Sequence, residues 1–157
     1  MDDFCVRIAE EDDVPVLLEL IRELAIYEKR LDSVVVDEGL LRSALFERRV
    51  AGALVGEIRG LPVGYAVFFH SFSTFIGRPG IHIEDVFVLP DYRGRGFGRA
   101  FFAFLARLAV ESECWGLEWT CLDWNQSARD LYSRMGAVHL EEWLVYRLEG
   151  DALKRFL

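Results

Sequence analysis

The sequence is poor in the residues that build disulfide frameworks and metal centres. Only three cysteines and three histidines occur among its 157 residues. The cysteines Cys5, Cys114 and Cys121 are odd in number and form neither a CxxC pair nor a Cys/His spacing typical of zinc. We therefore expect no disulfide framework and no metal, and we interpret the cysteines as small core residues in a reducing compartment.

The sequence also lacks the features of proteins that bind membranes or nucleic acid. The chain is 52% hydrophobic, yet no uninterrupted apolar run reaches the roughly 18 residues of a membrane span. The net charge of −8 argues against nucleic acid, which requires a cationic surface, and it suits a cationic substrate. The acidic start Met1-Asp2-Asp3 is unlike the basic beginning of a signal peptide. We expect a cytoplasmic protein that binds neither membranes nor nucleic acid.

The remaining pattern indicates one domain across residues 1–157, of the α/β (α+β) class. No internal repeat, low-complexity segment or linker interrupts the chain, and its length suits a single core. Alternating apolar patterns predict strands at Phe4–Ala9, Val50–Ile58, Val63–Phe72, Ile81–Leu89 and Trp115–Leu122, with one or two more in Val138–Leu148. Helical patterns predict helices at Glu11–Lys29, after Asp37, from Phe97 to about Glu113 and at Ser127–Met135.

The most informative segment is Arg93-Gly94-Arg95-Gly96-Phe97-Gly98, which stands between a predicted strand and a predicted helix. The first N–H groups of a helix lack partners within it, and the helix dipole adds positive potential there. Glycines let the backbone approach a ligand closely, and Arg93, Arg95 and Arg99 add charge. We interpret the segment as an anion cradle for a pyrophosphate. A dinucleotide fold would place G-x-G-x-x-G near the first strand, and no Walker lysine follows here.

Two motifs together carry a family resemblance. The pattern Arg93-x-x-Gly96-x-Gly98 resembles the acetyl-CoA motif of the GNAT acetyltransferase superfamily. The segment from Trp124 to Ala137 resembles that family's N-x-x-A-x-x-x-Y-x-x-x-G-F/A block. Glu23-Leu24-Ala25-x-Tyr27-Glu28 and Glu84-Asp85-Val86-Phe87-Val88 further resemble the diamine (spermidine/spermine) N-acetyltransferase branch.

The resemblance implies a fold and an assembly. It implies a mixed, mostly antiparallel sheet of about seven strands with four helices. The parallel strands 81–89 and 115–122 should splay apart to admit the pantetheine arm of acetyl-CoA. The branch forms homodimers, and apolar residues at Phe101 and Phe102 and in the Leu153/Phe156/Leu157 tail agree with a homodimer.

The resemblance also implies a set of site residues. Those implied to pair with pantetheine are Val86, Phe87 and Val88; those implied to hold pyrophosphate are Arg93, Gly94, Arg95, Gly96, Phe97, Gly98 and Arg99; those implied to flank the cofactor are Asn125, Gln126, Ser127 and Ala128; and those implied to line the amine site are Tyr27, Glu28 and Glu84. The segment Val138–Trp143 departs from the family pattern, which leaves open whether Glu141 or Glu142 contacts substrate.

The chemistry of amine acetylation explains two of these residues. An alkyl ammonium has a pKa of about 10.4, so it must be bound as a cation and then deprotonated before it attacks. Glu84 fits both tasks, unless it is a solvent-facing or salt-bridged strand carboxylate. Asp85 should point to the opposite face of the strand and be structural. Tyr132 is implied to protonate the departing CoA thiolate, unless it only packs against its own helix.

The sequence therefore predicts an acetyl-CoA-dependent N-acetyltransferase without metal. Its substrate would be a small cationic amine, either a diamine or polyamine or a lysine-like amine, which attacks directly in a ternary complex. An amino acid or a protein amine is an alternative acceptor. A non-catalytic acyl-CoA-binding regulatory module is an alternative of another class, but it would have no reason to keep both Glu84 and Tyr132.

Overall fold

The computed structural model describes residues 3–157, and the chain divides into two compact units at the Thr120–Cys121 bond. The first unit holds a five-stranded sheet, and the second, Cys121–Leu157, holds two short helices. The expectation of one domain across 1–157 stays a prediction. No helix within residues 3–157 is both long enough and apolar enough to span a membrane.

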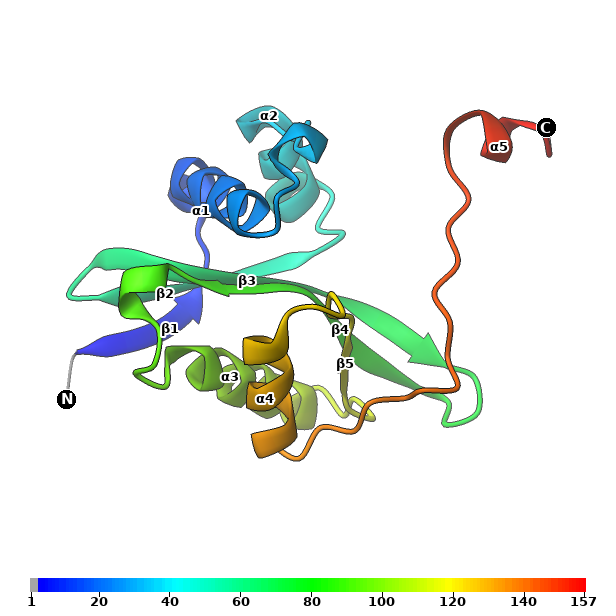
Figure 1. Ribbon diagram of the computed structural model, residues 1–157. Helices are drawn as coiled ribbons and strands as arrows, with labels where there is room; N and C mark the ends of the chain where they lie inside the picture. The colour runs from blue at the N-terminus through cyan, green and yellow to red at the C-terminus, as the bar shows by residue number, and fades with distance from the viewer. Residues whose placement is uncertain (1–2) are drawn as a thin grey trace. The chain divides into compact units, whose positions relative to one another are not determined.

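The sheet of the first unit has the order β1-β2-β3-β4-β5, with strands β1 (Phe4–Ile8), β2 (Gly52–Ile58), β3 (Leu61–Ser73), β4 (Arg78–Val88) and β5 (Leu117–Trp119) (Figure 1). The first four strands pair antiparallel, and β5 pairs parallel to β4. This confirms the expected fold class. The described residues form five strands rather than about seven, because 138–148 forms no strand despite its alternating apolar pattern.

Five α-helices accompany these strands, against the four expected. They are α1 (Val14–Tyr27), α2 (Glu38–Arg42), α3 (Phe97–Glu111), α4 (Gln126–Arg134) and α5 (Gly150–Lys154). Asp37 caps α2 as predicted, since its carboxylate accepts a hydrogen bond from the Leu40 amide at 2.8 Å. The helix α5 was not predicted, because five residues carry too little apolar periodicity to read.

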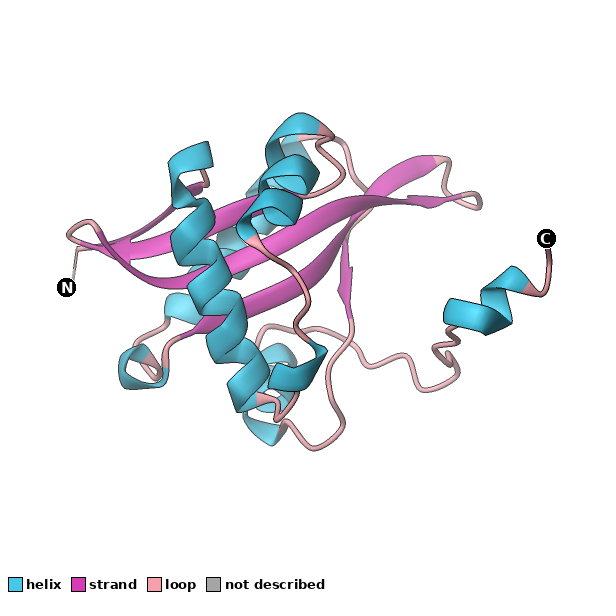
Figure 2. Ribbon diagram, turned by 90° about the horizontal axis from the view of Figure 1, so that it is seen from above, coloured by secondary structure: helices cyan, strands magenta, loops and turns pink. Residues whose placement is uncertain are grey.

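The helices of the first unit cover both faces of its sheet (Figures 1 and 2). On one face, α1 and α2 pack over buried side chains that include Leu17, Tyr65 and Phe87. On the other face, α3 buries Phe101 and Phe102, and the Phe102 ring meets Trp119 edge-on at 4.9 Å between centroids. Both phenylalanines therefore belong to the core and do not supply the apolar surface that the homodimer expectation used.

The parallel pair of the first unit, β4 and β5, lies at the edge of its sheet and is joined by a short ladder. The ladder between β4 and β5 joins Ile81 to Leu117, His82 to Glu118 and Ile83 to Trp119, and it ends there. The strand β4 continues to Val88 with only β3 beside it in this unit. The ladder therefore does not run out to Leu89, and the splay of the two strands stays a prediction.

The close approach of β4 to Gly64 on β3 makes a stability prediction. A Cβ at Gly64 would lie 2.6 Å from the Phe87 carbonyl oxygen, a backbone atom that cannot rotate away. Gly64→Ala should therefore lower the free energy of unfolding by about 1–3 kcal/mol in urea denaturation. Gly116→Ala is the matched control, because its Cβ meets no atom within 4 Å, and it should change stability by less than about 0.5 kcal/mol. Equal effects of the two substitutions would contradict the tight packing at Gly64.

Candidate active site

The glycine segment forms a turn that exposes the N-terminus of α3. A short 3-10 turn, Pro90–Tyr92, follows β4, and Gly96 then caps α3 with a φ of +85°. Gly94 also has a positive φ, of +77°, so both positions favour glycine. The Ala100 amide donates to the carbonyl of the capping residue Gly96 at 3.1 Å, and no acidic residue lies in the first turn. The amides ahead of Ala100 are therefore available to an anion.

Arg93 lies apart from these amides and contacts the end of α1. Its Nε donates to the Val88 carbonyl at 2.8 Å. Its guanidinium carbon lies 4.4 Å from the centroid of the Tyr27 ring and 5.3 Å from that of Phe87. These are cation–π distances, so the ring of a predicted amine-site residue already holds a cationic group of the protein. Arg95 and Arg99 are exposed.

A β-bulge decides where the two acidic residues of β4 lie. Val67 pairs with Asp85, whereas the next residue, Phe68, pairs with Ile83, so Glu84 is the extra residue. In a regular strand, Ile83 and Asp85 would share a face. Here they pair with Phe68 and Val67, which are consecutive in β3 and therefore point to opposite faces, so Ile83 and Asp85 lie on opposite faces as well. The simple alternation used to place Glu84 and Asp85 therefore does not hold here. Glu84 is exposed, and Asp85 is partly buried on the face of α1.

Asp85 is held by a phenol from the core. The Tyr65 hydroxyl donates to Asp85 Oδ2 at 3.0 Å, and Tyr65 is fully buried. Burial raises the pKa of Asp85 to about 6, and the charges of Glu84 and Glu28 add to this rise, while the hydrogen bond from Tyr65 opposes it. Burial, followed by the charge of Asp85, also raises the pKa of Tyr65, so the phenol stays protonated and donates. That Asp85 is only structural stays a prediction.

A small cavity of about 180 Å³ opens beside Asp85 at the C-terminal end of α1. Its polar lining comes from Asp85, Glu28, Arg30 and Ser33, and its apolar lining comes from Ile21, Leu24, Ala25 and Val34. Burial raises the pKa of Glu28, and the charge of Arg30 partly offsets that rise. The structure thus brings the predicted residue Glu28 together with Asp85 and Tyr65. Sequence reasoning missed Tyr65, because nothing in an apolar strand marks one aromatic residue as a hydrogen-bond donor.

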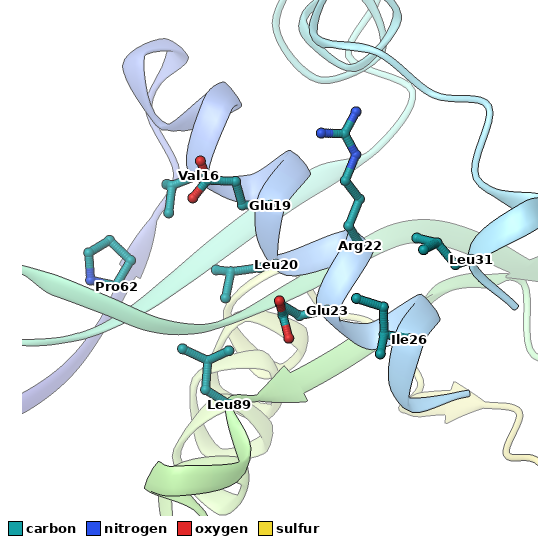
Figure 3. A pocket seen from close by; sticks show the side chains of 9 residues that line it. All are labelled: Val16, Glu19, Leu20, Arg22, Glu23, Ile26, Leu31, Pro62 and Leu89. Carbon is teal, nitrogen blue, oxygen red and sulfur yellow. The ribbon is translucent and has the colours of Figure 1, made fainter. Parts of the chain in front are cut away.

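A larger pocket, of about 500 Å³, lies elsewhere and contains none of the predicted site residues. It is bounded by α1 on one side and by Pro62 and Leu89 on the other, with Glu19, Arg22 and Glu23 among its lining side chains (Figure 3). The smaller cavity, by contrast, contains the predicted residue Glu28.

The other predicted residues divide between the units. Phe87 and Val88 are buried and Val86 is half-buried, on the part of β4 that extends beyond its ladder with β5. Phe97 is buried at the start of α3, and Gly98 follows it in the first turn. In the second unit, Asn125 caps α4, and its side chain accepts from the Ala128 amide at 3.3 Å. Gln126, Ser127 and the half-buried Tyr132 lie within α4.

The raised pKa of Asp85 predicts a pH dependence of stability. The folded protein holds a proton on Asp85 between about pH 4 and pH 6, where an unfolded aspartate with a pKa of about 3.9 has lost it. The folded state binds more protons, so stability falls as pH rises through this window. The unfolding free energy of the wild type minus that of Asp85→Asn should therefore decrease by about 2 kcal/mol from pH 4 to pH 7.

Urea denaturation at several pH values measures this difference. Glu111→Gln, which removes an exposed carboxylate on α3, is the control and should run parallel to the wild type. A wild-type curve parallel to that of Asp85→Asn would show that Asp85 titrates normally.

Comparison with known proteins agrees with this geometry. Residues 18–137 match the acetyltransferase (GNAT) family. Thialysine N-epsilon-acetyltransferase of Bos taurus is 40% identical, over 95% of this chain and 94% of that protein. Spermidine/spermine N(1)-acetyltransferase-like protein 1 of Homo sapiens is 29% identical, over 98% of this chain and 24% of that protein. The integron cassette protein VCH_CASS6 of V. cholerae shares the fold, with a TM-score of 0.82 at 23% identity, over 98% of this chain and 97% of that one. The resemblance seen in the two motifs is confirmed: the chain belongs to the GNAT acetyltransferase family and is an N-acetyltransferase.

Proposed function

We propose that this acetyltransferase takes its acetyl group from acetyl-CoA and transfers it to a primary amine of a small dication or lysine-like amine. Members of the GNAT family generally use acetyl-CoA as the acetyl donor. The observation that carries the proposal is the juxtaposition on β4 of three features: the open edge beyond Ile83, the exposed α3 N-terminus and the anionic cavity at Asp85.

The residues around the turn fit acetyl-CoA. A Cβ added at Gly94 or Gly96 would meet no atom within 4 Å, so the backbone there is open to close approach by a ligand. The amides of Gly94–Arg99 would hold the pyrophosphate, with Arg95 and Arg99 adding charge, and Val86–Val88 would pair with pantetheine. Asn125, Gln126, Ser127 and Ala128 would flank the cofactor, as the family pattern implies. When bound, acetyl-CoA supplies the thioester carbonyl that the amine attacks and the thiolate that leaves.

The chain's own side chains handle the amine and its protons. Tyr27 and Glu28 would line the amine site, and Glu84 would accept the ammonium proton, directly or through one water, before attack. The bulge exposes Glu84 immediately before the residues proposed for pantetheine, which supports this role. Tyr132 would then donate its phenolic proton to the leaving thiolate, which breaks its bond to the acetyl carbon as the amide bond forms.

The acceptor is proposed to be a diamine, a polyamine or a lysine analogue. Thialysine, named in the bovine relative, is such an analogue and supports a small amine over a protein. An amino-acid or protein amine remains an alternative acceptor. An acyl-CoA-binding regulatory module would show acetyl-CoA binding with no turnover of any amine. We also propose a cytoplasmic homodimer, which the exposed Leu153, Phe156 and Leu157 support.

The first functional prediction concerns the cofactor turn. Gly96→Val forces a β-branched residue to adopt a φ near +85°, which costs about 1–3 kcal/mol. The turn should therefore rearrange, and the affinity for acetyl-CoA, measured by calorimetry, should fall at least roughly tenfold. Gly60→Val is the matched control, because Gly60 has a φ of +81° and equally open surroundings but lies between β2 and β3. It should lose similar stability and keep full affinity. Unchanged affinity in a folded Gly96→Val protein would refute the cradle.

The second functional prediction concerns the proton donor. Tyr132→Phe keeps the ring and removes the proton, so turnover should fall by about 10²–10⁴-fold with acetyl-CoA affinity nearly unchanged. CoA release under single-turnover conditions measures the chemical step. Tyr146→Phe removes an exposed hydroxyl from the same unit and should have no effect. If Tyr132→Phe retains normal turnover when chemistry limits the rate, water protonates the thiolate and Tyr132 only packs.

A further inference from the structure

Two carboxylates and one guanidinium line the cavity beside Asp85, so its negative charge is only partly balanced. Asp85 and Glu28 both line it, and each has a raised pKa because it is partly buried. Asp85 is hydrogen-bonded to a neutral phenol, and it forms no ion pair with an arginine or lysine among residues 3–157. Arg30, the cationic residue of this lining, is exposed, and its charge partly offsets the raised pKa of Glu28. A partly buried carboxylate without a cationic partner is costly, and a bound ammonium group would relieve that cost.

The two acidic residues of the bulge suit different ammonium groups. A desolvated carboxylate stabilises the charged form of a bound amine and so raises the amine's pKa. Such a contact opposes deprotonation and is wrong for the amine that must attack. It is right for a second ammonium that stays charged throughout the reaction. Glu84 is exposed and adjacent to the residues proposed for pantetheine, whereas the partly buried Asp85 lines the open cavity beside α1.

We propose that Asp85 binds the non-reacting ammonium of a dicationic substrate, and that Tyr65 is the positioning residue that fixes the Asp85 carboxylate for this contact. The inference rests on the proposed function, because it assigns the second charge of the proposed substrate to this cavity. Asp85 then determines specificity by favouring amines with two cationic groups over monoamines. Tyr65 occupies Oδ2 and leaves Oδ1 for the ligand.

Matched substrates test the specificity. With 1,5-diaminopentane and 1-aminopentane as acceptors, the wild type should prefer the diamine in kcat/KM. Asp85→Asn should reduce that preference by about 10–100-fold, the usual size of one charge-assisted hydrogen bond, through the KM of the diamine. The kcat/KM for 1-aminopentane should fall by a much smaller factor than that for the diamine. An equal loss for both amines, or an unchanged preference, would overturn the proposal.

The positioning role of Tyr65 has its own signature. The charged and titratable groups that face Asp85 are Tyr65 on β3, Glu84 on β4, Glu28 at the end of α1, and Arg30 beyond it. Among these, the Tyr65 hydrogen bond lowers the pKa of Asp85. Tyr65→Phe should therefore raise that pKa, and diamine preference should be lost near neutral pH but recovered as the pH is raised. Tyr146→Phe is the control, and a loss that no pH recovers would show a purely structural effect.

A binding measurement separates this inference from the proposed function. The carboxyl ¹³C resonance of Asp85, assigned by its absence in Asp85→Asn, reports the pKa of Asp85 without any turnover. Adding 1,5-diaminopentane should lower that pKa by at least about one unit, while 1-aminopentane should leave it unchanged. If the protein acetylates neither amine and the shift still occurs, the proposed function fails and the cation site stands. If the diamine does not move the pKa, the cation site fails.

Discussion

The bulge at Glu84 is the constraint on which the rest of the site depends. It adds one residue to β4 opposite Val67 and Phe68, one residue past the last rung between β4 and β5. Asp85 consequently faces α1, where Tyr65 can reach it, while Glu84 is left exposed. The same short stretch of strand therefore presents a free edge, an exposed carboxylate and a partly buried one. A regular strand could not do this, because alternation would fix the face of every residue.

The environment of Asp85 also lowers the stability of the folded protein. Keeping Asp85 ionised beside Glu28, with a phenol as its hydrogen-bond partner, costs free energy of folding at neutral pH. Elsewhere in the unit, two partly buried carboxylates are paired with an arginine: Arg7 binds Asp13 at 2.7 Å and Glu57 at 3.1 Å. The contrast agrees with the cation site proposed at Asp85.

The sequence predicted the parts of this protein whose signals are local. The glycine turn before Phe97 and the Asp37 cap could be read because each depends on a few adjacent residues. The positions of Asp85 and Arg93 could not be predicted from the sequence. The position of Asp85 depends on pairing with β3, and that of Arg93 depends on contacts with α1. The alternating pattern of 138–148 predicted a strand that does not form, since apolar alternation specifies a strand only where a partner strand is present.

Arg93 contacts both the region proposed to bind the cofactor and the region proposed to bind the amine. Its backbone begins the glycine turn, while its guanidinium rests on Tyr27 and its Nε on the Val88 carbonyl. Any ligand that reorganises the turn therefore changes what the Tyr27 ring can accept. Such coupling is reciprocal, so the second ligand must alter the affinity of the first by the same factor. The strength of any such coupling would therefore depend on the contacts of one arginine side chain.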